Sequence, residues 1–193
     1  MTDTDIPDIL KRTAKAGHVI FTTGDYNLNI IGVRTKSRIA NKFDDYLYCV
    51  FKVADVWQEF KFAITTDPGL YHIKNPKYVV GTAIMVAGQY RGAYKIGTHR
   101  GYPALSQRGA KVKIYRDGNK DHILDHDPET SISGYFGINI HRATKYGTSK
   151  KVDKWSAGCQ VFANSDDFDL FLEICEKSAS IWGNKFTYTL LED

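Results

Sequence analysis

The segment Ile138–Phe162 contains a histidine and a cysteine that could act together as a base and a nucleophile. His141 ends an alternating apolar and polar run, and Cys159 closes the stretch Ser156-Ala157-Gly158-Cys159. A thiol becomes a strong nucleophile when its pKa falls, and a neighbouring imidazole can cause this by accepting and holding the proton. We therefore take Cys159 as the candidate nucleophile and His141 as its base.

The residues just before Cys159 fit the same chemistry. Gly158 would let the chain turn tightly and bring backbone amides close to a substrate carbonyl, where two N–H groups could hold the developing oxyanion. Ser156 could order this turn or bind substrate. A free cysteine alone is most often a small buried hydrophobe, and a single histidine is most often a satisfied polar side chain. The combination favours a catalytic site.

This grouping resembles the active-site signature of the L,D-transpeptidase catalytic domain (YkuD-like). That signature is a histidine, a variable stretch, then Ser or Thr, any residue, Gly and Cys. The matching positions are His141, the stretch Arg142–Trp155, and Ser156–Cys159. The stretch Thr65–Ile73 (TTDPGLYHI) also resembles a turn and strand near the start of that domain.

The resemblance implies a mostly β, barrel-like sandwich. It implies that Cys159 attacks the carbonyl on the L-centre side of an L,D peptide bond in a peptidoglycan stem, giving a thioester that an amine or water resolves. His141 would be general base and acid, and amides around Gly158 would form the oxyanion hole. Arg142 and Val161 depart from the Gly and Arg that the family commonly has there, so we expect a different pocket wall.

Further residues are candidates for substrate contact. Asn139 lies on the same strand face as His141 and could orient the imidazole or the substrate. The stretch Gly88–Tyr102 mixes aromatic side chains with polar donors, which suits a substrate-lining loop and equally a glycine-rich hairpin with exposed aromatics. The candidate substrate-binding residues are Asn139, His99, Gln89, Tyr90, Trp155 and Gln160.

A metal site is the first alternative. Asp121–Asp127 has two histidines four residues apart among carboxylates, and His99 could join His122 or His126 as a further zinc ligand. Pro128 and the neighbouring hairpin pattern favour solvated turn residues instead. We therefore expect no metal and no organic cofactor.

Other cysteine enzymes fit the order of residues less well. Sortases need an arginine downstream of the cysteine, and none follows Cys159. Papain-like and NlpC-type peptidases run cysteine before histidine, an order that Cys49 with His72, His99 or His141 would satisfy. Cys49 lies in an apolar strand pattern and is a better candidate for the core. The non-enzymatic alternative is a phage virion or wall-binding module in which Cys159 is inert.

The elements that must position these residues are mainly strands. Length favours one domain over 193 residues, and a chain with 42% hydrophobic and 25% charged residues can bury a core. Tyr, Phe and Gly outnumber Pro, which predicts a mostly β (α+β) fold with one N-terminal and one C-terminal flanking helix. The first helix is predicted over about 6–16, with Asp5 as its cap and Gly17 at its end.

Apolar and aromatic runs predict strands, in antiparallel order, from His18 to about Gly97. Asp117-Gly118 predicts a hairpin over Lys111–Leu124. The alternating run Gly134–His141 predicts a strand with one core face and one polar face. A last helix is predicted after Ser165, with an apolar stripe, and a closing strand over Lys185–Leu191.

Charge and cysteine content limit the partners. The net charge of +4 is spread along the chain, which argues against a dedicated nucleic-acid surface. Three cysteines do not make a disulfide scaffold, and no apolar run could cross a membrane. The N-terminus lacks a signal pattern, so we expect synthesis in the cytoplasm and action at the cell wall after release or delivery. We therefore expect a monomeric phage lytic enzyme acting on bacterial peptidoglycan by hydrolysis, with cross-linking transpeptidation as the alternative.

Overall fold

The computed structural model describes residues 6–193, and strand is the main secondary structure, at 39% against 18% helix. The mostly β prediction with flanking helices is therefore confirmed. In chain order the elements are α1 (Asp8–Lys15), β1 (Asn29–Arg34), β2 (Asp45–Val53), β3 (Val56–Thr65), α2 (Leu70–Lys74), β4 (Thr82–Met85), β5 (Gly88–His99), β6 (Tyr102–Gln107), β7 (Val112–Asp117), a 3₁₀ turn (Pro128–Thr130), β8 (Ile132–Gly134), β9 (Ile140–Arg142), β10 (Gln160–Phe162), α3 (Ser165–Trp182) and β11 (Phe186–Glu192).

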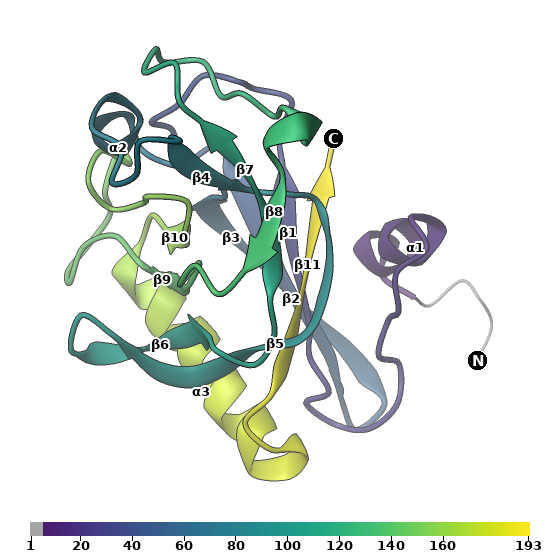
Figure 1. The fold of residues 1–193 in the computed structure, drawn as a ribbon. Helices are drawn as coiled ribbons and strands as arrows, with labels where there is room; N and C mark the ends of the chain where they lie inside the picture. Colours follow the sequence, from purple (N-terminus) through teal and green to yellow (C-terminus); the bar gives the residue numbers. More distant parts are fainter. Residues whose placement is uncertain (1–5) are drawn as a thin grey trace.

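Eight of these strands form a closed barrel in the order β1-β11-β5-β6-β9-β10-β3-β2 (Figure 1). The strands that pair with each other within His18–Gly97, β1 with β2 and β2 with β3, are antiparallel as predicted. Two neighbouring pairs that involve later strands, β1 with β11 and β9 with β10, are parallel. A long connection separates β9 from β10 in the chain, and only such a crossover can return a strand in the same direction. His141 lies on β9, and Cys159 immediately precedes β10.

A second sheet, in the order β4-β7-β8, lies on top of the barrel in the view of Figure 1. The predicted hairpin over Lys111–Leu124 is wrong, because both edges of β7 are already occupied, by β4 and by β8. The chain beyond Gly118 forms a loop instead, with a single bridge from Ile123 to Ile39. This sheet forms one wall of the pocket described below.

The main core joins the inward side chains of the barrel to the apolar side of α3. Phe168, Phe171, Leu172 and Cys175 of α3 are buried as predicted, whereas Trp182 at the end of the stripe is half exposed. Asn164 caps the helix by accepting hydrogen bonds from the amides of Asp166 and Asp167. The helix α1 packs on the outer side of the barrel, where Ile9 and Leu10 join side chains of β1, β2 and β11.

Several local predictions need correction. Residues 18–23 form no strand, and Leu70–Lys74 forms the short helix α2 where a strand was expected. The predicted run Gly134–His141 is interrupted at Gly137, whose φ of +69° is incompatible with an extended strand. Its apolar face nevertheless points to the core, through Phe136, Ile138 and Ile140. Asp5, the expected cap of α1, lies outside the described residues.

Two further findings bear on the environment of the chain. Cys49, Cys159 and Cys175 are all free thiols. No helix among residues 6–193 is both long enough and apolar enough to cross a membrane.

Candidate active site

The parallel pairing of β9 with β10 determines which side chains share a face. Gln160 lies beside Ile140 and Val161 beside His141, so residue 159 lies level with residue 139. Ile140 and Gln160 point into the barrel, where Gln160 meets the core residue Tyr188. Successive side chains of a strand alternate between faces. His141 and Cys159 therefore share the opposite, outer face, one strand apart and two residues out of register.

His141 is held in one tautomer by the backbone. Its Nδ1 lies 2.8 Å from the carbonyl oxygen of Arg142, with the hydroxyl of Tyr102 at 3.2 Å. A carbonyl oxygen can only accept, so Nδ1 carries the hydrogen and donates it. Nε2 is then the unprotonated nitrogen, and it is buried without any hydrogen-bond partner. This nitrogen is available to accept a proton.

His99 lies flat against the ring of His141. The two ring centroids are 3.9 Å apart with an angle of 12° between the planes. Asn139 orients His99, because its Nδ2 donates to Nδ1 of His99 at 3.1 Å while its Oδ1 accepts from the amide of Gln107. The side chain of Asn139 therefore contacts the imidazole of His99 and not that of His141. Asn139 acts on His141 through His99.

The loop before Cys159 is shaped by Ser156. Its hydroxyl donates to the carbonyl oxygen of Cys159 at 2.8 Å and accepts from the amide of Gly158 at 3.1 Å. Ser156 is fully buried, so of its two predicted roles it orders the turn. Gly158 has a φ of +114°, and a Cβ there would lie 2.5 Å from the carbonyl oxygen of Ala83. Only glycine fits this position without displacing β4.

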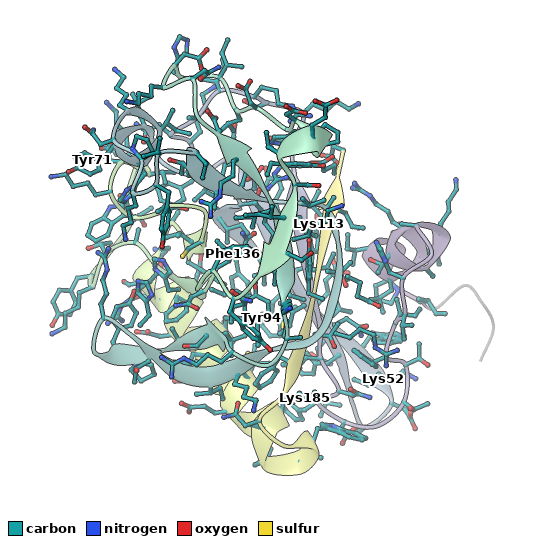
Figure 2. The ribbon with its side chains drawn as sticks, in the orientation of Figure 1. Lys52, Tyr71, Tyr94, Lys113, Phe136 and Lys185 are labelled. Atoms are coloured by element: carbon teal, nitrogen blue, oxygen red, sulfur yellow. The ribbon has the colours of Figure 1, made fainter. Side chains whose placement is uncertain are left out.

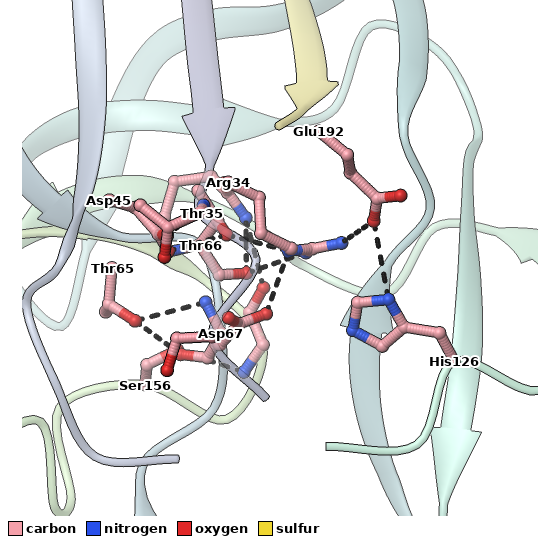
Figure 3. A network of polar contacts seen from close by, with 12 residues as sticks. Arg34, Thr35, Asp45, Thr65, Thr66, Asp67, His126, Ser156 and Glu192 are labelled. Atoms are coloured by element: carbon pink, nitrogen blue, oxygen red, sulfur yellow. Dashed lines mark hydrogen bonds and ion pairs between the residues drawn. The ribbon is translucent and has the colours of Figure 1, made fainter. Parts of the chain in front are cut away.

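A buried polar network supports this loop from below. The amide of Gly69 donates to the carbonyl of Ser156, and Nε2 of Gln160 lies 3.4 Å from the carbonyl oxygen of Thr66. Thr66 is fixed in turn by Asp45 and by Arg34, whose guanidinium also pairs with Asp67 at 3.0 Å (Figure 3). The stretch Thr65–Ile73 therefore lies directly against the cysteine loop.

Cys159 and His141 both line one pocket of about 260 Å³. Phe136 lies over the middle of the molecule, where it borders this pocket, while Tyr71 lies on α2 at the periphery (Figure 2). Lining side chains come from five segments of the chain, including β7, the hairpin of β5 and β6, and the loop before Cys159. Cys159 is 8% exposed, and its thiol donates to the carbonyl oxygen of Gly137 at 3.5 Å. The thiol therefore donates to Gly137 and not to His141.

Burial keeps both Cys159 and His141 neutral. It raises the pKa of the Cys159 thiol to about 11, although a hydrogen bond from the Asn139 amide and the charges of Arg100 and Lys77 oppose the shift. Burial lowers the pKa of His141 to about 3, and His99 lowers it further. The prediction of a thiol with a lowered pKa is therefore wrong. The arrangement is a neutral thiol beside a neutral imidazole.

Some predicted site residues lie elsewhere. Gln89 bonds to Val19 and Thr189, and Tyr90 donates to the carbonyl oxygen of Val86, both away from the pocket. Gln160 is fully buried inside the barrel, where its Oε1 accepts from Tyr188. Asn139 is not among the lining residues either. Gln89, Tyr90, Gln160 and Asn139 therefore all lie outside the pocket that holds Cys159.

The other two predicted substrate-binding residues, His99 and Trp155, both line the cavity. The Gly158 amide, predicted for the oxyanion hole, is used by Ser156. Sequence reasoning missed the charged lining, in particular Lys77, Arg100 and Arg116. Only Arg100 carried a usable signal, since it adjoins His99 in the glycine-rich stretch.

The metal alternative finds no support in the arrangement of side chains. Among residues 6–193, no three His, Cys, Asp or Glu side chains converge as a ligand set. His126 instead stacks on Tyr115 and lies 3.3 Å from Glu192. Comparison of the chain with models of protein families, with curated proteins and with solved structures gives no match.

Proposed function

We propose that the chain is a cysteine-dependent hydrolase of peptidoglycan stem peptides that works through a thioester at an L,D-type peptide bond. One observation carries the proposal. Cys159 and His141, whose buried Nε2 has no hydrogen-bond partner, line the same small pocket on one face of a parallel strand pair. A nucleophile and a base with a fixed tautomer are the minimum set for acyl transfer.

The first half of the reaction forms the acyl-enzyme. On substrate binding the thiol leaves the carbonyl of Gly137 and gives its proton to Nε2 of His141 as sulfur attacks the carbonyl carbon. The imidazolium formed is stabilised through Nδ1, which donates to the Arg142 carbonyl. The tetrahedral intermediate collapses when the C–N bond breaks and Nε2–H protonates the leaving amine. A thioester with Cys159 and a free amine result.

The second half restores the enzyme. Nε2 of His141 takes a proton from water as the water oxygen attacks the thioester, and the same proton returns to sulfur as the C–S bond breaks. A peptide acid leaves and the thiol is regenerated. If an amine replaces water, the same steps give transpeptidation. We place hydrolysis first because the proposed role is lytic.

The test is digestion of purified peptidoglycan followed by mass spectrometry of the muropeptides. We expect new carboxyl termini with the wild-type protein and none with Cys159→Ala or His141→Ala. His122→Ala is the matched control, since that side chain is exposed and outside the pocket. Circular dichroism checks that each variant is folded.

The outcomes separate the alternatives. New cross-linked dimers in place of new termini would favour transpeptidation. Full activity in Cys159→Ala would refute the cysteine mechanism. Binding to peptidoglycan by a folded wild-type protein without any change in the muropeptides would favour a non-catalytic wall-binding module.

A further inference from the structure

The pocket around Cys159 is lined by cations from four separate parts of the chain. Lys77 precedes β4, Arg100 lies in the turn between β5 and β6, Arg116 belongs to β7, and Lys154 lies in the loop before Cys159. No aspartate or glutamate is found among the described lining residues. A cleft lined by charges of one sign concentrates its field on the space inside. The interior therefore favours a negatively charged group.

These four cations lack the acidic partners that other basic side chains have. Arg34 pairs with Asp67 and Glu192, and Arg142 pairs with Asp169 at 3.2 Å. Within residues 6–193, no ion pair is formed by any of the four lining cations. Like charges gathered without counter-charges repel one another, and a bound anion removes that repulsion.

Arg116 is positioned to donate to such an anion. Its guanidinium carbon lies 5.1 Å from the ring of Tyr78 and 5.5 Å from the ring of Phe136, which hold it between two aromatic faces. Nη1 donates to the carbonyl oxygen of Gly81 at 3.2 Å. Nε is buried and has no acceptor. A buried donor without a partner is costly, and a ligand oxygen would satisfy it.

We propose that this lining is a carboxylate subsite, in which Arg116 donates to a carboxylate of the substrate beside the bond attacked by Cys159, while Lys77 and Arg100 neutralise its charge. The position of the attacked bond rests on the proposed function, whereas the binding of the anion does not. A guanidinium suits this task because its planar fork matches a carboxylate.

A pair of thiol reagents tests the subsite without any peptidase activity. Iodoacetate and iodoacetamide alkylate sulfur by the same reaction. Iodoacetate carries a negatively charged carboxylate, whereas iodoacetamide carries a neutral carboxamide. The measured quantity is the rate with iodoacetate divided by the rate with iodoacetamide at Cys159. We expect Arg116→Gln to lower this ratio by about tenfold, which is the effect expected from the loss of a charge-assisted hydrogen bond. Arg108→Gln is the matched control, because Arg108 is exposed and outside the pocket.

An unchanged ratio of the iodoacetate rate to the iodoacetamide rate in Arg116→Gln would overturn the proposal of a carboxylate subsite. If Arg116→Gln does not fold, Lys77→Gln serves in its place, since Lys77 is exposed at the pocket. A ratio that falls equally in Arg108→Gln would also overturn the proposal, because only net charge would then matter.

Synthetic L,D-peptides identify which carboxylate of the substrate binds at Arg116. Four peptides combine an acid or amide on the side chain of the L-residue with an acid or amide at the C-terminus. Replacing the carboxylate that binds Arg116 by an amide should lower kcat/KM by about tenfold in the wild type. The same replacement should have little effect in Arg116→Gln. Equal cleavage of all four peptides would overturn the subsite. Cleavage of none would refute the proposed function, and the reagent ratio would still decide the subsite.

Discussion

The pH dependence of Cys159 alkylation follows directly from its burial. With a pKa of about 11 against the ordinary 9.0, the thiolate fraction at pH 8 falls from about 1 in 10 to about 1 in 1,000. A more basic thiolate is also a better nucleophile, by about tenfold over two pKa units for a Brønsted slope of about 0.45. The expected net effect is alkylation about tenfold slower than that of an unperturbed cysteine.

The assay is iodoacetamide labelling between pH 6 and pH 10, with the modified residue located by peptide mass spectrometry. We expect the Cys159 rate to rise about tenfold per pH unit across this range, because deprotonation is far from complete below pH 10. No step is expected near pH 6.5, since burial keeps the pKa of His141 near 3 and its imidazole neutral throughout.

The other two thiols provide internal references. Burial raises the pKa of Cys49 and of Cys175 further than that of Cys159, and neither is exposed at all. Both should therefore label more slowly than Cys159 in the folded protein. A Cys159 rate that levels off above neutral pH would refute this reasoning, because it would indicate a thiolate–imidazolium pair at rest.

Three substitutions test the framework around the site by urea unfolding. Gly158→Ala should lower the free energy of unfolding by about 2 kcal/mol or more, because the new Cβ meets both a positive φ and the backbone of Ala83. Gly147→Ala introduces the strain of a positive φ alone and should therefore cost less. Equal losses of stability in the two variants would contradict the contact with Ala83 as a cause. Tyr188→Phe leaves Oε1 of Gln160 without its donor and should cost about 1–3 kcal/mol, while Tyr94→Phe, whose hydroxyl reaches only the sulfur of Met85, should cost less. Cys175→Ala removes a fully buried sulfur from the core and should cost about 1–2 kcal/mol; a stability equal to wild type would contradict this, because the transfer free energy of the sulfur is lost even if the cavity collapses.

Local patterning determined much of the fold. The strand Val56–Thr65 and the helix Ser165–Trp182 begin and end close to where apolar runs, capping residues and Gly183 predict. These elements depend on side chains close together in the chain, so their signals are local. The pairing of strands is not local. The predicted hairpin after Asp117 failed because β7 pairs with β4 and β8, and the sequence around a turn does not say which edges are occupied.

The candidate site shows the same division. The types and spacing of His141 and Cys159 suggested a base and a nucleophile, and alternation along the strand placed the histidine on the polar face. Only the tertiary structure decided that a parallel register sets Cys159 on that same face, and that Gly137 accepts the thiol hydrogen bond. It also decided that both groups rest neutral and that Arg116 lines their pocket. The physical reason is that burial and electric fields arise from atoms distant in the chain, which local sequence does not specify.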